Sequence, residues 1–225
     1  MPINAQKGDD LPVSAFKGME DGTMPLGTSQ YEKRGIATHL PVWDKDECIQ
    51  CNRCSMCCPH AAIRPILLDE AEESAKPAEF ETVAAKGMNG KYTYRLQVSP
   101  YDCLGCGVCL TACPAEGALT MTSFEDMKPE QTLFDEVAMN ESYLKKDVIN
   151  DKSVKNVQFA KPYFQFSAAC AGCAETSYAR LITQLFGEKM FISNATGCSS
   201  IWGGTASISP YTTNKESGHG PAWIN

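Results

Sequence analysis

A helical pattern of apolar side chains near the C-terminal end is the clearest periodic signal in this sequence. Apolar residues recur there at positions i, i+3, i+4, i+7 and i+8, which are Tyr178, Leu181, Ile182, Leu185 and Phe186. This spacing predicts an amphipathic helix, and Gly187 can supply its left-handed C-cap. A short apolar strand over 190–193 and a turn over 194–198 follow, without a clear second strand. We therefore expect the start of an α/β domain over 163–225, incomplete as given.

A second pattern, with a period of two, lies in the middle of the chain. Alternate residues are apolar at Tyr92, Tyr94, Leu96 and Val98. Such alternation predicts a half-buried strand, and the preceding Asn89-Gly90 pair is a tight-turn signal. Both features fall in an insertion over 69–99, which interrupts a module assigned to 37–127.

The segments on either side of this module show weaker patterns. Residues 1–36 are rich in Gly, Pro, Asp and Thr without sustained periodicity, which predicts an extended linker. Residues 128–162 are charged and polar, with Pro129 at a position where a helix can begin. A weak apolar pattern follows it at Leu133, Phe134 and Val137. We expect a linker with a helix between two domains.

Composition and charge exclude several classes of function. The 225 residues are 43% hydrophobic and carry a net charge of −7, which indicates a globular chain and disfavours nucleic acid as a partner. No apolar stretch approaches the roughly 20 residues that cross a bilayer, so no membrane attachment is expected. The N-terminus lacks the apolar core of a signal peptide. The twelve cysteines are therefore predicted to be metal ligands in a reducing cytoplasm.

Eight of the cysteines form two copies of the pattern C-x₂-C-x₂-C-x₃-C-P, over 48–59 and 103–114. Bacterial-type ferredoxins hold two [4Fe–4S] clusters with this run, and the fourth cysteine of each run ligates the other cluster. The predicted ligand sets are therefore crosswise. They are Cys48, Cys51, Cys54 and Cys113 for one cluster, and Cys103, Cys106, Cys109 and Cys58 for the second. The repeat predicts an α+β, ferredoxin-like module with a pseudo-twofold axis.

Two neighbours of the first motif lie outside this ligand scheme. Cys57 breaks the spacing and is predicted to be a buried thiol that binds no iron. His60 follows the Cys-Pro pair and could donate a hydrogen bond to cluster sulfur, although a packing role is favoured. Structural zinc is a poor alternative for the eight cysteines, because zinc sites use four ligands per ion, commonly as two Cys-x₂-Cys pairs.

A third set of cysteines follows the linker. Cys170 and Cys173 form a C-x₂-C pair, and Cys198 lies beyond the predicted helix and strand. A lone C-x₂-C pair also occurs in redox-active and zinc sites. Three cysteines cannot complete a cubane, so a fourth ligand is expected outside this sequence, unless one iron is open.

The residues around this third set resemble pyruvate:ferredoxin (flavodoxin) oxidoreductase. The resemblance rests on Cys-Ala-Gly-Cys-Ala-Glu-Thr from Cys170 and on Asn-Ala-Thr-Gly-Cys-Ser from Asn194, and it extends over nearly the whole chain. It implies that the C-terminal part begins a domain that binds thiamine diphosphate. It also implies that Cys170, Cys173 and Cys198 hold a third [4Fe–4S] cluster, and that Glu175 and Cys198 touch the thiamine diphosphate.

The resemblance further implies a reaction, cofactors and partners. Pyruvate and coenzyme A would give acetyl-CoA and carbon dioxide, with electrons leaving singly through the clusters to ferredoxin or flavodoxin. The third cluster, thiamine diphosphate and its Mg²⁺ are expected only in the complete protein, which the resemblance makes a homodimer. The direction of the reaction and the order of the two ferredoxin-type clusters are not fixed by the sequence.

Two readings of the chain remain at this point. The first is a piece of such an oxidoreductase that is inactive alone, with no catalytic residue of its own, because the family's Gly-Asp-Gly motif and its pyruvate and coenzyme A domains lie elsewhere. The second is a stand-alone two-cluster electron carrier or an electron-transfer subunit. The C-terminal helix, strand and Ala-Thr-Gly-Cys turn favour the first, because a simple carrier has no use for them.

Overall fold

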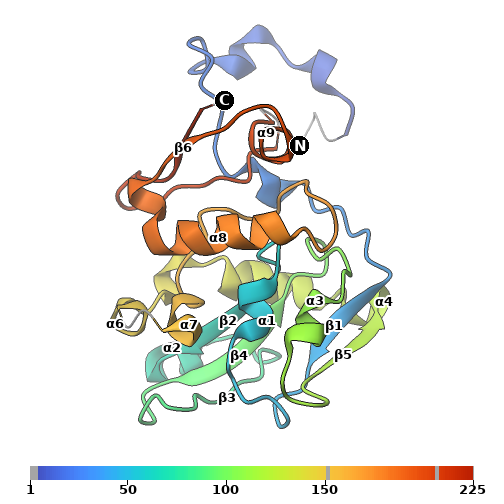
Figure 1. Cartoon of the computed structure of the whole chain (residues 1–225), viewed down its shortest axis with the longest axis vertical. Helices are drawn as coiled ribbons and strands as arrows, with labels where there is room; N and C mark the ends of the chain where they lie inside the picture. The colour runs from blue at the N-terminus through green and yellow to red at the C-terminus, as the bar shows by residue number, and fades with distance from the viewer. Residues whose placement is uncertain (1–4, 151–152, 206–207, 225) are drawn as a thin grey trace.

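The computed structural model describes residues 5–150, 153–205 and 208–224. Figure 1 shows two regions: a lower one containing β1 to β5 and an upper one containing α8, α9 and β6. None of the helices in the described ranges is long and apolar enough to cross a membrane. The described chain is a mixture of helices and strands, as the sequence predicts.

The two cysteine motifs lie in two copies of one strand, helix and strand unit. The first copy contains β1 (His39–Trp43), α1 (Arg53–Cys57) and β2 (Ile63–Leu68), and the second contains β4 (Thr93–Val98), α3 (Val108–Ala112) and β5 (Leu119–Ser123). Strand β1 pairs antiparallel with β5, and β2 pairs antiparallel with β4. Each pair takes one strand from each copy, so the copies are interlocked.

The insertion between the copies forms ordered structure on the edge of the second sheet. Helix α2 (Glu70–Ala75) begins with a capping box between Asp69 and Glu72. Strand β3 (Val83–Ala84) then pairs with β4, which gives the order β2-β4-β3. Asn89 and Gly90 both have positive φ, 51° and 71°, and the Lys91 amide donates to the Met88 carbonyl at 3.0 Å. The predicted tight turn is confirmed, with the φ signs of a type I′ turn.

Strand β4 is confirmed, but its predicted half-burial is wrong. Arg95 and Gln97, on the face expected to be solvated, are only 8% and 1% exposed. Helix α5 (Glu130–Leu133) covers them. The Arg95 guanidinium pairs with the Glu130 carboxylate at 2.6 Å, and Gln97 Nε2 donates to the Glu130 carbonyl at 3.1 Å. Burial of these polar groups is tolerated because each has a partner.

Short helices follow the ferredoxin-like module. They are α4 (Phe124–Met127), α5, the π-helix η4 (Phe134–Ala138), the 3₁₀-helix η5 (Glu141–Tyr143), α6 (Lys146–Ile149) and α7 (Val154–Val157). Helix α5 begins after Pro129, as predicted. The three apolar residues named for this segment are buried, at 8% exposure or less. Leu133 and Val137 pack in a cluster with Ile66, Leu68 and Phe80, and the Phe134 ring packs edge-on against the Phe166 ring. The segment therefore packs on the sheet formed by β2, β4 and β3.

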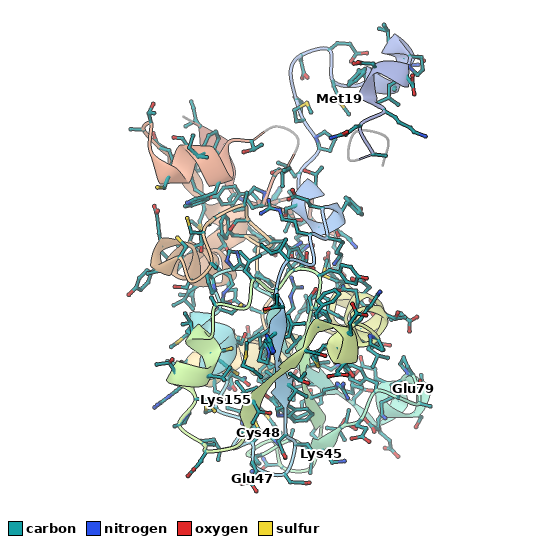
Figure 2. The ribbon with its side chains drawn as sticks, turned by 90° about the vertical axis from the view of Figure 1, so that its right-hand side faces the viewer. Met19, Lys45, Glu47, Cys48, Glu79 and Lys155 are labelled. Carbon is teal, nitrogen blue, oxygen red and sulfur yellow. The ribbon has the colours of Figure 1, made fainter. Side chains whose placement is uncertain are left out.

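The N-terminal segment contains three 3₁₀-helices and no strand in its described part, 5–36. They are η1 (Gly8–Asp10), η2 (Val13–Phe16) and η3 (Thr28–Tyr31). In Figure 2 the stretch around Met19 stands away from the body of the molecule. The stretch near η3 is attached, because the Gly27 amide donates to the Tyr211 carbonyl at 2.7 Å and the Lys33 ammonium pairs with the buried Asp102 carboxylate at 2.7 Å. The prediction of an extended linker therefore fits only the part of this segment that precedes η3.

The C-terminal region contains helices flanking a small parallel sheet. Its elements are α8 (Ala174–Phe186), η6 (Gly187–Lys189), β6 (Phe191–Ser193), α9 (Cys198–Gly203) and β7 (Ala222–Ile224). Strand β6 pairs parallel with β7, from Phe191 opposite Ala222 to Ser193 opposite Ile224. This second strand was not predicted, because β7 is only three residues long and carries no detectable sequence pattern.

Helix α8 is present as predicted, but a different face of it is buried. Tyr178, Ile182 and Phe186, which belong to the apolar stripe, are 67%, 44% and 57% exposed. The buried side chains are polar: Thr176, Arg180 and Thr183. The helix turns this polar face toward α1, whose C-terminal carbonyls need hydrogen-bond donors.

The predicted left-handed cap at Gly187 is also wrong. Gly187 is the C-cap of α8, but its φ of −46° is right-handed and the chain continues into η6. Glycine is needed for another reason, because a Cβ at this position would lie 2.3 Å from Cδ2 of Tyr163. Close contact with an aromatic ring therefore selects glycine at the end of this helix.

We predict that Gly187→Ala destabilises the protein by about 1–3 kcal/mol, the usual cost of overpacking a filled site. The measurement is anaerobic urea unfolding followed by tryptophan fluorescence. Lys189→Ala is the control, because Lys189 is exposed in the same short helix. Adding Tyr163→Leu to Gly187→Ala should recover part of the loss, and an unchanged unfolding midpoint in Gly187→Ala would contradict the contact.

Candidate iron–sulfur centres

The two motif loops share one backbone conformation. Gln50 and Asn52 in the first loop have φ of 59° and 60°, and the equivalent Gly105 and Gly107 in the second have 66° and 74°. This turn directs backbone amides toward sulfur. The Gln50 amide donates to Cys48 Sγ at 3.3 Å, and the Gly105 amide donates to Cys103 Sγ at 3.4 Å. Such N–H donors stabilise a thiolate.

The first loop adopts left-handed conformations without glycine because its side chains are held. The Gln50 side chain donates to the Ala84 carbonyl at 2.9 Å and accepts from the Lys86 amide at 2.7 Å. Asn52 donates to the Lys155 carbonyl at 2.9 Å and accepts from the Tyr94 hydroxyl at 2.9 Å. These four bonds offset the backbone strain, so β3, the residues after it, β4 and α7 fix the shape of the loop.

The fourth cysteine of each motif leaves its own loop. Cys58 and Cys113 are the C-caps of α1 and α3, each in an extended conformation and each followed by proline. The two helices contact each other. Each fourth cysteine therefore lies beside the loop of the other copy.

The cysteines surround two cavities of about 310 and 340 Å³, openings to solvent included. The smaller is lined by Cys48, Cys51, Cys54 and Cys113, together with Trp43, Tyr94 and Leu96. The larger is lined by Cys103, Cys106, Cys109 and Cys58, together with Pro41 and His60. The structure thus brings together the same two crosswise groups that the motif spacing predicts. Four thiols around an enclosed space suit a cluster bound by four cysteines.

Burial makes three of these thiols poor acids without a metal. Desolvation, with repulsion from neighbouring cysteines, raises the pKa of Cys103 to about 12 and raises the pKa values of Cys54 and Cys109 well above the ordinary value. A thiolate is the form that binds metal, so the positive charge of iron has to drive deprotonation. The donor set fits an iron–sulfur cluster.

Cys57 lines neither of these cavities. Its Sγ–H donates to the Cys54 carbonyl at 3.4 Å, and burial raises its pKa to about 11. The thiol is half-buried and remains neutral at pH 7. This placement agrees with the prediction of a thiol that is not a ligand.

His60 lies between the larger cavity and the third cysteine loop. Its ring is 2% exposed and lines that cavity, and both nitrogens lie near the backbone of Ser167 and Cys170 without a hydrogen bond of good geometry. Burial lowers its pKa to about 4. The imidazole is therefore neutral at pH 7.

The third set of cysteines is more open. Cys170 and Cys198 are exposed, and Cys173 is half-buried at the N-cap of α8. In the described ranges, no three His, Cys, Asp or Glu side chains are grouped to hold a single metal ion. The loop that carries the pair touches the second motif, because a Cβ on Gly172 would lie 3.6 Å from the Cβ of Cys106. Glu175 is exposed in the first turn of α8.

Sequence reasoning missed two cations beside these centres. Lys33 lies near the rings of Phe134 and Phe166, and Arg180 is buried against the end of α1. The only available signal for Arg180 was its place with Thr176 and Thr183 on the polar face of α8. That face was expected to point to solvent.

Comparisons with known proteins agree with these cysteine centres. A family model described as a 4Fe-4S dicluster domain matches residues 47–118, and one described as a domain of unknown function matches 1–37. Pyruvate-flavodoxin oxidoreductase of Enterobacter agglomerans is 53% identical over 226 residues, and pyruvate:ferredoxin oxidoreductase of Moorella thermoacetica is 52% identical over 229. Pyruvate dehydrogenase [NADP(+)] of Cryptosporidium parvum is 51% identical over 227.

These matches cover the whole of this chain but only part of each relative. The chain spans 19% of the first two proteins and 11% of the third. The resemblance to the pyruvate oxidoreductases is therefore confirmed along the entire chain, which corresponds to a segment with an iron–sulfur dicluster domain.

We predict that Cys57→Ser and Cys58→Ser differ sharply in iron content. Two intact cubanes give about eight iron atoms per chain, and Cys57→Ser should keep them because its thiol lies off both cavities. Cys58→Ser should lose up to half, because it removes a thiolate from the larger cavity. Colorimetric iron analysis after anaerobic reconstitution measures both. Equal iron loss in the two variants would contradict the assignment.

We predict that His60 makes the protein less stable in acid. The unfolded chain takes up a proton near pH 6.5 and the folded chain only near pH 4, so stability is present above pH 6.5 and is lost as the pH falls toward 4. The expected loss is about 2 kcal/mol between pH 7 and pH 5. Anaerobic urea unfolding at both pH values measures it.

His60→Leu should remove this part of the pH dependence. The control is His39→Leu, because His39 is exposed. Groups with other pKa shifts, such as Asp102, are present in all three proteins and cancel in the comparison. An identical pH dependence in wild type and His60→Leu would refute the prediction.

Proposed function

We propose that this chain conducts single electrons through two [4Fe–4S] clusters, as the electron-transfer part of a larger enzyme that oxidises pyruvate. The observation that carries the proposal is the pair of cavities, each lined by four cysteines drawn crosswise from two loops. The whole-length match to pyruvate-flavodoxin and pyruvate:ferredoxin oxidoreductases supports the larger context. Ferredoxin or flavodoxin would then be the acceptor.

The eight motif cysteines are the proposed ligands. Cys48, Cys51, Cys54 and Cys113 would hold one cluster, and Cys103, Cys106, Cys109 and Cys58 the other. The chain supplies the thiolates, the N–H donors to sulfur and the apolar walls, which together set a cluster's potential. All twelve cysteines are free thiols, in keeping with a reducing cytoplasm.

The contact between the third cysteine loop and the second motif supports an order for the two proposed clusters. Gly172 lies against Cys106, so the cluster of Cys58, Cys103, Cys106 and Cys109 would be the middle one. The cluster of the first motif would be the outer one. Cys48 lies at the end of the molecule far from Met19, near Lys45 and Glu47, and the adjacent Ile49 is 50% exposed (Figure 2). An acceptor could approach there.

The C-terminal region is the proposed start of a thiamine diphosphate-binding domain. Cys170, Cys173 and Cys198 would supply three ligands of a third cluster, with the fourth from outside these residues. Glu175 and Cys198 would lie against the cofactor, which supplies the carbanion chemistry when bound with Mg²⁺. The exposed apolar stripe of α8 supports this proposal, because further protein would cover it.

The complete enzyme would bind pyruvate and coenzyme A and would be a homodimer, as the family resemblance implies. This chain would hold no catalytic residue of the decarboxylation. Its own role would be to shield the clusters from water and to hold them at fixed distances from each other. The clusters would then lie in sequence between the thiamine diphosphate and the electron acceptor. The direction of the reaction would depend on the reduction potentials of the clusters, which span about −700 to +450 mV across proteins.

We predict that the reconstituted chain passes electrons to a flavodoxin but does not oxidise pyruvate. After photochemical reduction and removal of the reductant, mixing with oxidised flavodoxin should give flavodoxin semiquinone, measured by stopped-flow absorbance. The chain with pyruvate, coenzyme A and thiamine diphosphate should reduce no dye. Cys51→Ala, which should remove the outer cluster, is the control and should slow the transfer at least tenfold.

Two results would contradict the proposal. A chain with two reducible clusters that reduces no acceptor would not be the outlet for electrons. A colourless zinc protein without a reducible paramagnetic signal would exclude iron–sulfur chemistry altogether.

A further inference from the structure

Arg180 on α8 is a buried cation that donates only to neutral groups. Its side chain is among the largest that are fully buried, at 1% exposure. Its hydrogen-bond acceptors are the Cys58 carbonyl at 3.2 Å, the Met56 carbonyl at 2.6 Å, Gln158 Oε1 at 3.1 Å and Gln184 Oε1 at 2.6 Å. Of the carboxylates in the described ranges, none forms an ion pair with it. A buried charge without a counter-ion is costly.

The group beside Arg180 that can carry the opposite charge is Cys58, a proposed cluster ligand whose carbonyl accepts from Arg180 Nε at 3.2 Å. Burial lowers the pKa of the Arg180 guanidinium to about 10, and negative charge on the nearby Cys58 acts in the other direction. The group therefore stays cationic at pH 7. A second arginine, the half-buried Arg64, senses the charge of Asp102 and, more weakly, that of Cys58, and its hydrogen-bond acceptors are neutral groups of Ala61, Ala138 and Gln165.

A cluster in the larger cavity would supply the missing negative charge. A cubane with four thiolate ligands is a net anion, and reduction by one electron makes it more negative. A fixed cation nearby favours the reduced form, because the attraction is strong where water is excluded. Net charge and hydrogen bonding in the surroundings are known determinants of cluster potential.

We propose that Arg180 is the buried countercharge of the cluster held by Cys58, Cys103, Cys106 and Cys109, and that it raises the reduction potential of this cluster. The inference rests on the proposed ligand sets. It extends the proposed function by naming the residue that sets how well the middle cluster accepts an electron.

In the described ranges, the cations near the loop of the outer cluster are more open to solvent than Arg180. Arg53 in the loop itself is exposed, and the ammonium groups of Lys86 and Lys155 make exposed hydrogen bonds, where solvent screens their charge. Arg180 also lies about two turns beyond Cys173, in the helix that follows the third cysteine pair. A raised potential at the middle cluster would draw electrons away from the thiamine side.

A structural role is the competing explanation, because Arg180 donates to two carbonyls at the end of α1. Charge and packing can be separated with three variants. Arg180→Gln removes the charge and keeps some hydrogen bonding. Arg180→Lys keeps the charge but loses the planar set of N–H donors of the guanidinium. Gln184→Glu keeps Arg180 and adds a carboxylate at the acceptor that lies 2.6 Å from its Nη1.

The test is an anaerobic redox titration of the reconstituted chain, with dithionite as the electron donor and paramagnetic resonance of the reduced clusters as the readout. Arg180→Gln and Gln184→Glu should each lower one of two midpoint potentials by at least about 59 mV, which is a tenfold loss in the reduction equilibrium constant of a one-electron couple. In Arg180→Lys, the reduction equilibrium constant of the same cluster should stay within threefold of the wild-type value. Cys106→Ala identifies the middle cluster, because it should abolish the shifted wave.

Arg53→Gln is the matched control. It removes one positive charge from α1 at an exposed position. The reduction equilibrium constants of both clusters should therefore stay within threefold of those of the wild type. Iron content is measured for every variant. If Arg180→Gln fails to retain iron, Gln184→Glu decides the outcome, because it leaves the arginine and its backbone contacts in place.

The possible failures are distinguishable. A wild-type chain without two reducible clusters would overturn the proposed function. Two reducible clusters whose potentials are unchanged in Arg180→Gln and Gln184→Glu would overturn only the role of Arg180. A potential lowered in Arg180→Lys as much as in Arg180→Gln, with Gln184→Glu unchanged, would assign Arg180 to packing and also overturn the proposal.

Discussion

The gathering of four cysteines from two separate loops around each cavity governs this structure. Three cysteines on one tight loop cannot complete a cubane, so each loop depends on the cysteine that follows the other copy's helix. Cys58 and Cys113 meet this need only if α1 and α3 pack together and the copies exchange strands. The interlocked pairing of β1 with β5 and of β2 with β4 is the backbone arrangement that the proposed crosswise ligation needs. A free copy would have neither a complete ligand set nor a complete sheet.

The two loops solve the same geometric problem with different residues. The second uses Gly105 and Gly107, which adopt positive φ without strain. The first uses Gln50 and Asn52, whose side chains bind the backbone of the insertion and of α7. The insertion is therefore part of the outer centre, and its loss would release a strained loop. In the first loop, two polar side chains hold one partly exposed site in a rigid conformation.

The sequence predicted what depends on local spacing and failed where a partner surface decides. Cysteine spacing and the Asn89-Gly90 turn are set within a few residues, so both cysteine groups and the turn were predictable. The buried face of α8 was not, because its neighbours are the carbonyls of Met56 and Cys58, more than 120 residues earlier. Arg95 and Gln97 were misplaced for the same reason, since Glu130 on a later helix satisfies them. Sequence patterns predict that polar residues are exposed to solvent whenever the distant groups that bind them are unknown.

Three residues connect the two regions at their junction. Arg180 ties α8 to the end of α1, Gly172 touches Cys106, and His60 fills the space between the larger cavity and the loop of Cys170. An apolar junction would hold the regions together equally well, but it would leave a net anionic cluster in a medium of low dielectric without compensation. The polar junction binds the regions and, in the proposed arrangement, would place a fixed positive charge beside the same cluster. Docking and electron transfer would then be served by the same residues.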